Sequence, residues 1–121
     1  MANLGKFGAL RTKFAGLADF VTIYIAEAHP AERKHFIDNY AIDTHASMEE
    51  RIEAANTLKE EAGEFLKGCP ILVSFIYFYV IAINTILFQV DCMDDQANLA
   101  YAALPERLYV IRDGIITFEV G

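Results

Sequence analysis

Apolar positions recur every three to four residues at the start of the chain. The series consists of Phe7, Leu10, Phe14 and Leu17, with Lys6, Arg11 and Lys13 between them. This spacing is typical of an amphipathic helix, so we expect a helix over residues 7–17 that ends before Asp19. Residues 20–25 (FVTIYI) are β-branched or aromatic, and such a run predicts a central strand. Residues 26–40 are expected to form a loop or an irregular crossover.

A longer helix is predicted over residues 47–67. Ser47 and Glu50 have the spacing of a capping box, which begins many helices. Apolar side chains then follow one face of the predicted helix: Met48, Ile52, Ala55, Leu58, Ala62 and Leu66. Gly68 suits the end of the helix, and Pro70 prevents its continuation.

The last part of the chain has the pattern of a short helix followed by a hairpin. Residues 94–103 predict the helix, and residues 107–112 and 115–120 predict two strands around the two-residue turn Asp113–Gly114. The order of elements favours an α/β class and fits the later two-thirds of a thioredoxin-like fold. Such folds begin with a strand–helix unit that carries a reactive cysteine or selenocysteine, and we expect that unit to be missing here.

Residues 71–90 form a long stretch without a charged side chain. As a helix, a stretch of this length would span about 30 Å, which is the thickness of a bilayer core. A membrane-spanning helix and a buried helix are both consistent with this composition. The membrane interpretation has a difficulty, because it would place the helix at 47–67 and the strand at 107–112 on opposite sides of the bilayer.

Composition and charge exclude some classes of function. The chain has 121 residues, of which 55% are hydrophobic, and a formal net charge of −7. An acidic chain of this kind repels phosphate backbones, so nucleic acid is not an expected partner. Cys69 and Cys92 match neither a CxxC pair nor a zinc motif, so no metal site is predicted and reduced thiols are favoured over a disulfide. Residues 1–10 do not have the pattern of a signal peptide.

Three ordered segments resemble the iodothyronine deiodinases. They are residues 18–29 (ADFVTIYIAEAH), 43–58 (DTHASMEERIEAANTL) and 90–111 (VDCMDDQANLAYAALPERLYVI). The first is similar to the family pattern D-F-L-x-x-Y-I-x-x-A-H. The family consists of dimeric selenoenzymes that reductively remove iodine from thyroid hormones, and its members have a thioredoxin-like fold. They are anchored to the endoplasmic reticulum or plasma membrane with a cytosolic active site.

The resemblance implies roles for five residues. His29, Glu27 and His45 match catalytic positions of the family, and Arg107 and Tyr24 match positions that bind the substrate. A histidine can give up and recover a proton near neutral pH, and Glu27 could orient an imidazole. The residues alone leave other interpretations open: His29 and His45 as surface or packing residues, Tyr24 as a core residue, and Arg107 as a solvent-facing strand residue.

The sequence also departs from the family. Residues 32–34 (ERK) stand where a D-G-W sequence is usual, which affects the expected dimer contact. The family's selenocysteine, followed by Pro-Pro-Phe, precedes a segment resembling residues 1–7, and a further strand extension and helix follow the position of Gly121. We therefore expect residues 1–121 to be a single partial domain, truncated at both ends. Such a chain would lack the nucleophile and would be inactive alone.

The resemblance also gives residues 71–90 a third interpretation. Excising residues 73–89 would join Leu72 to Val90 and produce CPILVDCM, which matches a family strand. Val73–Ser74 and Phe88–Gln89 can be encoded as a splice donor and an acceptor. Residues 73–89 are thus a translated intron or a membrane-spanning insertion, with a buried helix as a third alternative.

The chemistry implied by the resemblance has three requirements. A polarizable nucleophile attacks iodine, a proton reaches the ring carbon, and an external thiol reductant regenerates the nucleophile, with no bound cofactor. The expected partners are an iodothyronine and a second copy of the chain. Cys92 is either a resolving thiol or, more simply, a small buried residue. The competing functions are a small single-span membrane or interaction protein and a thioredoxin-like remnant without a substrate.

Overall fold

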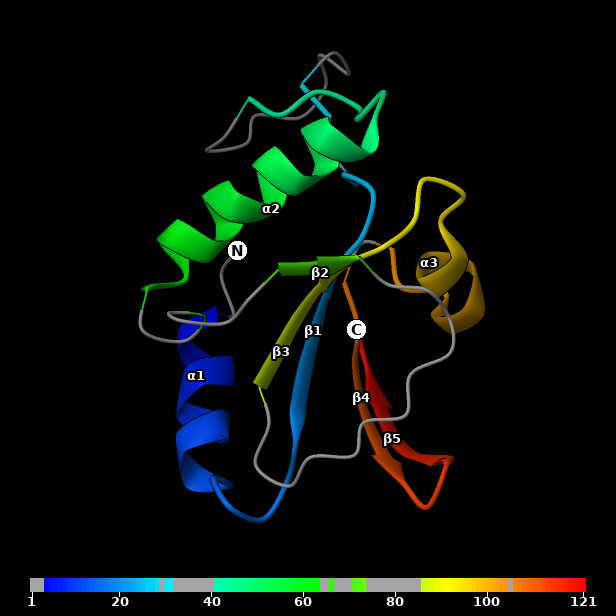
Figure 1. Ribbon diagram of the computed structural model, residues 1–121. Helices are drawn as coiled ribbons and strands as arrows, with labels where there is room; N and C mark the ends of the chain where they lie inside the picture. The colour runs from blue at the N-terminus through cyan, green and yellow to red at the C-terminus, as the bar shows by residue number, and fades with distance from the viewer. Residues whose placement is uncertain are drawn as a thin grey trace.

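The computed structural model describes residues 4–28, 30–31, 41–63, 66, 71–73, 86–104 and 106–121. Its elements, in chain order, are α1 (Leu4–Lys13), β1 (Phe20–Tyr24), α2 (Met48–Glu61), β2 (Ile71–Val73), β3 (Ile86–Val90), α3 (Gln96–Tyr101), β4 (Leu108–Arg112) and β5 (Ile115–Val120) (Figure 1). Helices and strands are mixed along the chain, and this confirms the predicted α/β class.

A three-stranded parallel sheet organises the molecule, with the strand order β1-β3-β2. Tyr24 at the end of β1 pairs with Val90 at the end of β3, and Val73 of β2 pairs with the same residue. The three strands therefore end at one edge of the sheet. The prediction that residues 20–25 form a central strand is wrong for the described sheet, in which β1 is an edge strand and β3 is central. An apolar run shows that a strand is largely covered, and it does not show how many neighbours pair with it.

Both longer helices end earlier than predicted, and a glycine explains each end. α2 stops at Glu61, and Gly63 just beyond it has a positive φ of 57°. α1 stops at Lys13, and Gly16 has a φ of 81°. Glycine adopts this left-handed conformation without the steric penalty of a Cβ atom, so it ends helices that an apolar pattern alone would continue.

The predicted start of the long helix is confirmed. The backbone N–H of Glu50 donates to Ser47 Oγ at 3.3 Å. The Glu50 carboxylate in turn accepts from the backbone N–H of Ala46 at 2.7 Å. Two N–H groups near the start of the helix thus gain partners in a close variant of the capping box.

The hairpin of β4 and β5 is antiparallel and turns where the sequence predicts. Asp113 and Gly114 have φ values of 53° and 76°. Two consecutive residues with positive φ are what the favoured two-residue hairpin turn requires. The hairpin lies beside the parallel sheet without joining it (Figure 1).

The core lies between α2 and the parallel sheet. Ala55, Leu66, Phe88 and Val90 are buried together. Partly buried side chains pack around them: Phe7, Tyr24, Met48, Ile52, Leu58 and Ala62. The rings of Phe7 and Phe20 pack edge to face with their centres 5.9 Å apart, which places α1 against β1.

The apolar stretch at 71–90 begins and ends with strands. Residues 71–73 form β2 and residues 86–90 form β3, so neither a membrane helix nor a buried helix extends over the whole stretch. Its isoleucine, valine and phenylalanine residues suit strands, and an apolar run by itself cannot distinguish a strand from a buried helix. In the part of the chain that the structure describes, no helix is long and apolar enough to cross a membrane. Residues 74–85 lie outside that part, and the intron interpretation stays a prediction.

Candidate active site

The candidate site lies at the edge where the parallel strands end. Tyr24 is the last residue of β1, and Asp91 directly follows β3. The backbone N–H of Asp91 donates to the Tyr24 carbonyl at 2.8 Å, so the two chain segments stay together beyond the sheet. In open α/β sheets, ligands bind preferentially at this carboxyl edge. α2 and α3 both approach it (Figure 1).

Tyr24 and Glu27 are joined by a hydrogen bond. The Tyr24 hydroxyl donates to Glu27 Oε1, in a partly buried position. Burial raises the pKa of Tyr24 far above its ordinary value, and the hydrogen bond to Glu27 and its negative charge act in the same direction. The phenol therefore stays protonated at any physiological pH and acts as a fixed donor.

His45 packs beside this pair. Its ring centre lies 5.8 Å from that of Tyr24, with an angle of 42° between the planes. Only 7% of His45 is exposed, and neither ring nitrogen has a hydrogen-bond partner among the described residues. Burial lowers the pKa of His45, and the nearby positive charge of Arg51 lowers it further. A neutral imidazole has one N–H donor and one acceptor, so it can exchange a proton with a bound polar group.

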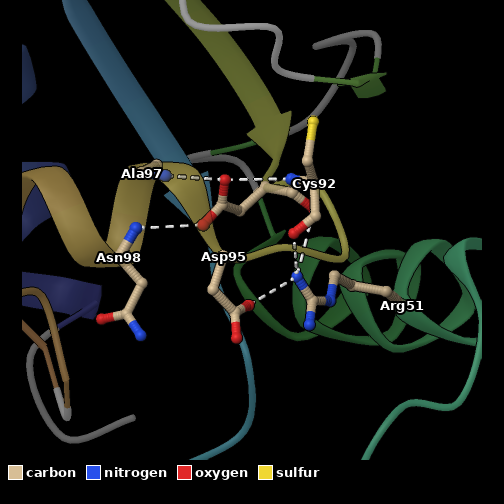
Figure 2. Close-up of polar contacts among 6 residues, drawn as sticks. Arg51, Cys92, Asp95, Ala97 and Asn98 are labelled. Carbon is tan, nitrogen blue, oxygen red and sulfur yellow. Dashed lines mark hydrogen bonds and ion pairs between the residues drawn. The ribbon is translucent and has the colours of Figure 1, made fainter.

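Arg51 is the main residue of the site that the sequence interpretation missed. It lies on α2, and only 3% of it is exposed. Its Nη1 atom donates to the carbonyls of Asp91 at 3.2 Å and Cys92 at 2.6 Å. The same nitrogen forms an ion pair with Asp95 Oδ1 at 2.9 Å (Figure 2). The available signal was its position three residues after Met48 and four before Ala55, which places a charged residue on the apolar face of the helix.

The carboxylate of Asp91 is a second feature that was missed. Only 1% of Asp91 is exposed. Its oxygens accept from the backbone N–H groups of Cys92 at 2.9 Å, Ala97 at 2.9 Å and Asn98 at 3.0 Å (Figure 2). Two of these donors belong to the first turn of α3, whose N–H groups have no partner within the helix. Asp91 thus fixes α3 against the end of β3.

Arg107 lies apart from this cluster. Its Nε atom donates to the Ala102 carbonyl at 3.1 Å. Its Nη1 atom pairs with Glu119 of β5 at 2.8 Å, and about a third of its side chain is exposed. Of the predicted site residues, the structure therefore brings together Tyr24, Glu27 and His45, and it holds Arg107 on the hairpin. His29 lies outside the described residues.

Cys92 is half-buried, so the prediction of a buried residue is wrong. Its sulfur points away from Arg51 (Figure 2). Burial raises the pKa of the thiol, and the negative charges of Asp94 and Asp91 add to this effect. A thiol with a raised pKa is a poor nucleophile at neutral pH. Within the described ranges, no group of three or more His, Cys, Asp or Glu residues is arranged to hold a metal ion.

Known proteins similar to this chain are deiodinases. The family model described as iodothyronine deiodinase matches residues 1–121. The type I iodothyronine deiodinase of Xenopus laevis is 34% identical over 117 residues, which cover 97% of this chain and 38% of that protein. The thyroxine 5-deiodinases of Rattus norvegicus and Homo sapiens are 34% identical over 122 residues, which cover the whole chain and 33% of each relative. The chain thus spans 33–38% of the length of these curated relatives.

Proposed function

Because this chain belongs to the iodothyronine deiodinase family, we propose that its protein removes iodine reductively from an iodothyronine such as thyroxine. The family match over residues 1–121 carries the proposal. The geometry supports it, because Tyr24, Glu27 and His45 meet at the carboxyl edge of a parallel sheet. This is a suitable place to bind a substrate and to handle a proton.

The reaction needs a soft nucleophile for iodine, a proton for the ring carbon and a source of two electrons. None of the 121 residues is a selenocysteine. In this proposal a selenolate from a residue outside the 121 attacks iodine, so that the C–I bond breaks as an Se–I bond forms and the ring carbon takes up a proton. Two external thiols then reduce the Se–I bond to selenolate and iodide and become a disulfide, without a bound cofactor. A preparation of the 121 residues alone would therefore be inactive.

His45 is proposed to bind or pass on a proton. Burial and the charge of Arg51 lower the pKa of His45, which favours the neutral imidazole. Neither ring nitrogen has a hydrogen-bond partner among the described residues, so one can donate and the other accept. Tyr24 holds Glu27 through its hydroxyl, and the negative charge of Glu27 raises the pKa of His45. His29 is proposed as the second catalytic histidine, on the family resemblance alone.

Arg107 is proposed to bind the carboxylate or phenolate of the hormone. A guanidinium holds planar anions well through paired N–H donors. About a third of the Arg107 side chain is exposed, which leaves it accessible to a solute. A bound anion would compete with Glu119 for Nη1, so substrate binding would loosen the ion pair that closes the hairpin end.

The remaining expectations belong to the same proposal. They are a thioredoxin-like fold, a homodimer, and association with the endoplasmic reticulum or plasma membrane with the site in the cytosol. In the described part of the chain, no observation favours a single-span membrane or interaction protein over a deiodinase.

The test is iodide release by the full protein that contains this chain. We expect release from labelled thyroxine in the presence of dithiothreitol, with the de-iodinated hormone identified by mass spectrometry. The 121-residue chain alone is the matched control and should release none. A folded, selenium-containing full protein that releases no iodide from thyroxine, triiodothyronine or iodotyrosine would contradict the proposal.

A further inference from the structure

A buried arginine connects the parts of the candidate site. Arg51 comes from α2, and its guanidinium reaches the backbone that leaves β3. Moving a charge out of water is costly unless it is well paired, and an apolar residue would pack at less cost. A guanidinium that is 97% covered therefore calls for an explanation, which we look for in the groups around it.

The contacts of Arg51 continue to Tyr24 through one residue. The carbonyl of Asp91 accepts from Arg51, and the N–H of Asp91 donates to the Tyr24 carbonyl. His45 lies just before the start of α2 and packs against the Tyr24 ring. Both α2, which carries Arg51, and β1, which carries Tyr24, are thus hydrogen-bonded to the backbone of Asp91.

We propose that Arg51 is a positioning residue of the site: it holds α2 against the end of β3, so that His45 stays packed on Tyr24. The inference rests on the proposed function, since it concerns the placement of the histidine to which that function assigns a proton. Arg51 is not itself given a contact with the substrate.

The charges around His45 act in opposite directions. Glu27 after β1, Glu50 on α2 and Asp95 before α3 all favour the protonated imidazole. Among the described residues that act on His45, Arg51 is the only cation, and it acts together with burial to favour the neutral form. Arg51 also pairs with Asp95, which reduces the effect of that carboxylate on His45. Removing the guanidinium would leave the effect of these three carboxylates on the His45 pKa without the opposing charge of Arg51.

The experiment follows the titration of His45 in the full protein by NMR of ¹⁵N-labelled histidine, with H45N used to assign the signal. We expect the pKa of His45 to rise in R51Q and to return toward the wild-type position in R51K. Lys59→Met is the matched control, because it removes a cation from the same helix about 12 Å further along the axis. It should leave the titration unchanged.

The dependence of the rate on pH gives a second readout that a merely structural anchor would not move. If neutral His45 is the active form, the acidic limb of the iodide-release profile moves to higher pH in R51Q. The rate at pH 6 relative to pH 8 then falls. R51K should restore the ratio.

Two results would overturn the inference: a folded R51Q protein in which His45 titrates as in the wild type, or a K59M protein with an equal rise. If R51Q does not fold, Arg51→citrulline keeps the shape and most donors without the charge, and the same titration decides. A wild-type protein that releases no iodide would count against the proposed function, whereas the His45 titration would still decide the role of Arg51.

Discussion

The carboxyl edge of the sheet and the β4–β5 hairpin both carry charged residues, but they hold them differently. At the edge, Arg51 and Asp91 are almost fully buried and join segments 40 residues apart in the chain. On the hairpin, Arg107 pairs with Glu119 at the surface, 12 residues away. Losing one partner of a buried polar contact costs more than losing an exposed ion pair. The edge should therefore be rigid and sensitive to substitution, and the hairpin tolerant and adaptable.

Replacing Asp91 should give the largest loss of stability at the carboxyl edge. Asp91→Ala would leave the backbone N–H groups of Cys92, Ala97 and Asn98 without their acceptor. We expect a loss of about 4 kcal/mol in the free energy of unfolding, because one buried and two partly buried donors lose charge-assisted bonds. Urea unfolding followed by circular dichroism measures it. Asp94→Ala, an exposed neighbour, should cost about 0.5 kcal/mol or less.

Replacing one tyrosine hydroxyl in each region compares the stability that a single hydrogen bond contributes at the edge and on the hairpin. Tyr24→Phe removes the donor to Glu27 in a partly buried position. Tyr109→Phe removes a hydroxyl that donates to the Tyr101 carbonyl at the surface. We expect a loss of about 1 kcal/mol for the first and less than half of that for the second, because buried acceptors lose more when left unpaired. Equal losses in urea unfolding would remove the distinction between the regions.

The buried histidine predicts a dependence of stability on pH. The pKa of His45 is lower in the folded than in the unfolded state. The unfolded state then binds more protons as the pH falls below about 6.5, so the folded protein loses stability in this range until it reaches the lower folded pKa. Urea midpoints at pH 5, 6, 7 and 8 should fall toward acid. His45→Asn should flatten the curve, and an unchanged slope in that variant would place the effect elsewhere.

Replacing Arg107 should give the smallest change in the free energy of unfolding and a clear change in hormone binding. Arg107→Met removes an exposed ion pair, so we expect less than about 0.5 kcal/mol in the free energy of unfolding. If Arg107 holds an anionic group of the hormone, KM for iodide release rises while the fold is unaffected. Glu119→Gln keeps the guanidinium and removes its competitor, so KM should stay level or fall. Unchanged kinetics in R107M would make Arg107 an ordinary solvent-facing residue.

Local signals in the sequence predicted the parts of the fold that depend on neighbours in the chain. Ser47 with Glu50 marked the start of α2, and Asp113–Gly114 marked the turn of the hairpin. The predicted helices were too long at their C-terminal ends, because Gly16 and Gly63 were not recognised as residues with the left-handed backbone conformation that ends a helix. The apolar spacing continues past both glycines, so the pattern alone did not indicate that a helix ends there.

Features that depend on distant contacts were harder to predict. The central place of β3 and the strands at either end of residues 71–90 follow from pairing, which an apolar run does not specify. The resemblance selected Tyr24, Glu27 and His45, and the structure brings these three together. Arg51 was missed because its acceptors lie 40 or more residues away, so its spacing showed only a charge on an apolar face.

The most direct test of the account compares iodide release by the wild-type full protein and its H45N variant, at equal concentrations of folded protein, thyroxine and dithiothreitol. We expect release by the wild type and a loss of at least about a hundredfold in the variant, because a group that handles a proton is removed. Equal rates in two folded proteins would contradict the central claim that proton handling takes place beside Tyr24 at the carboxyl edge of the sheet.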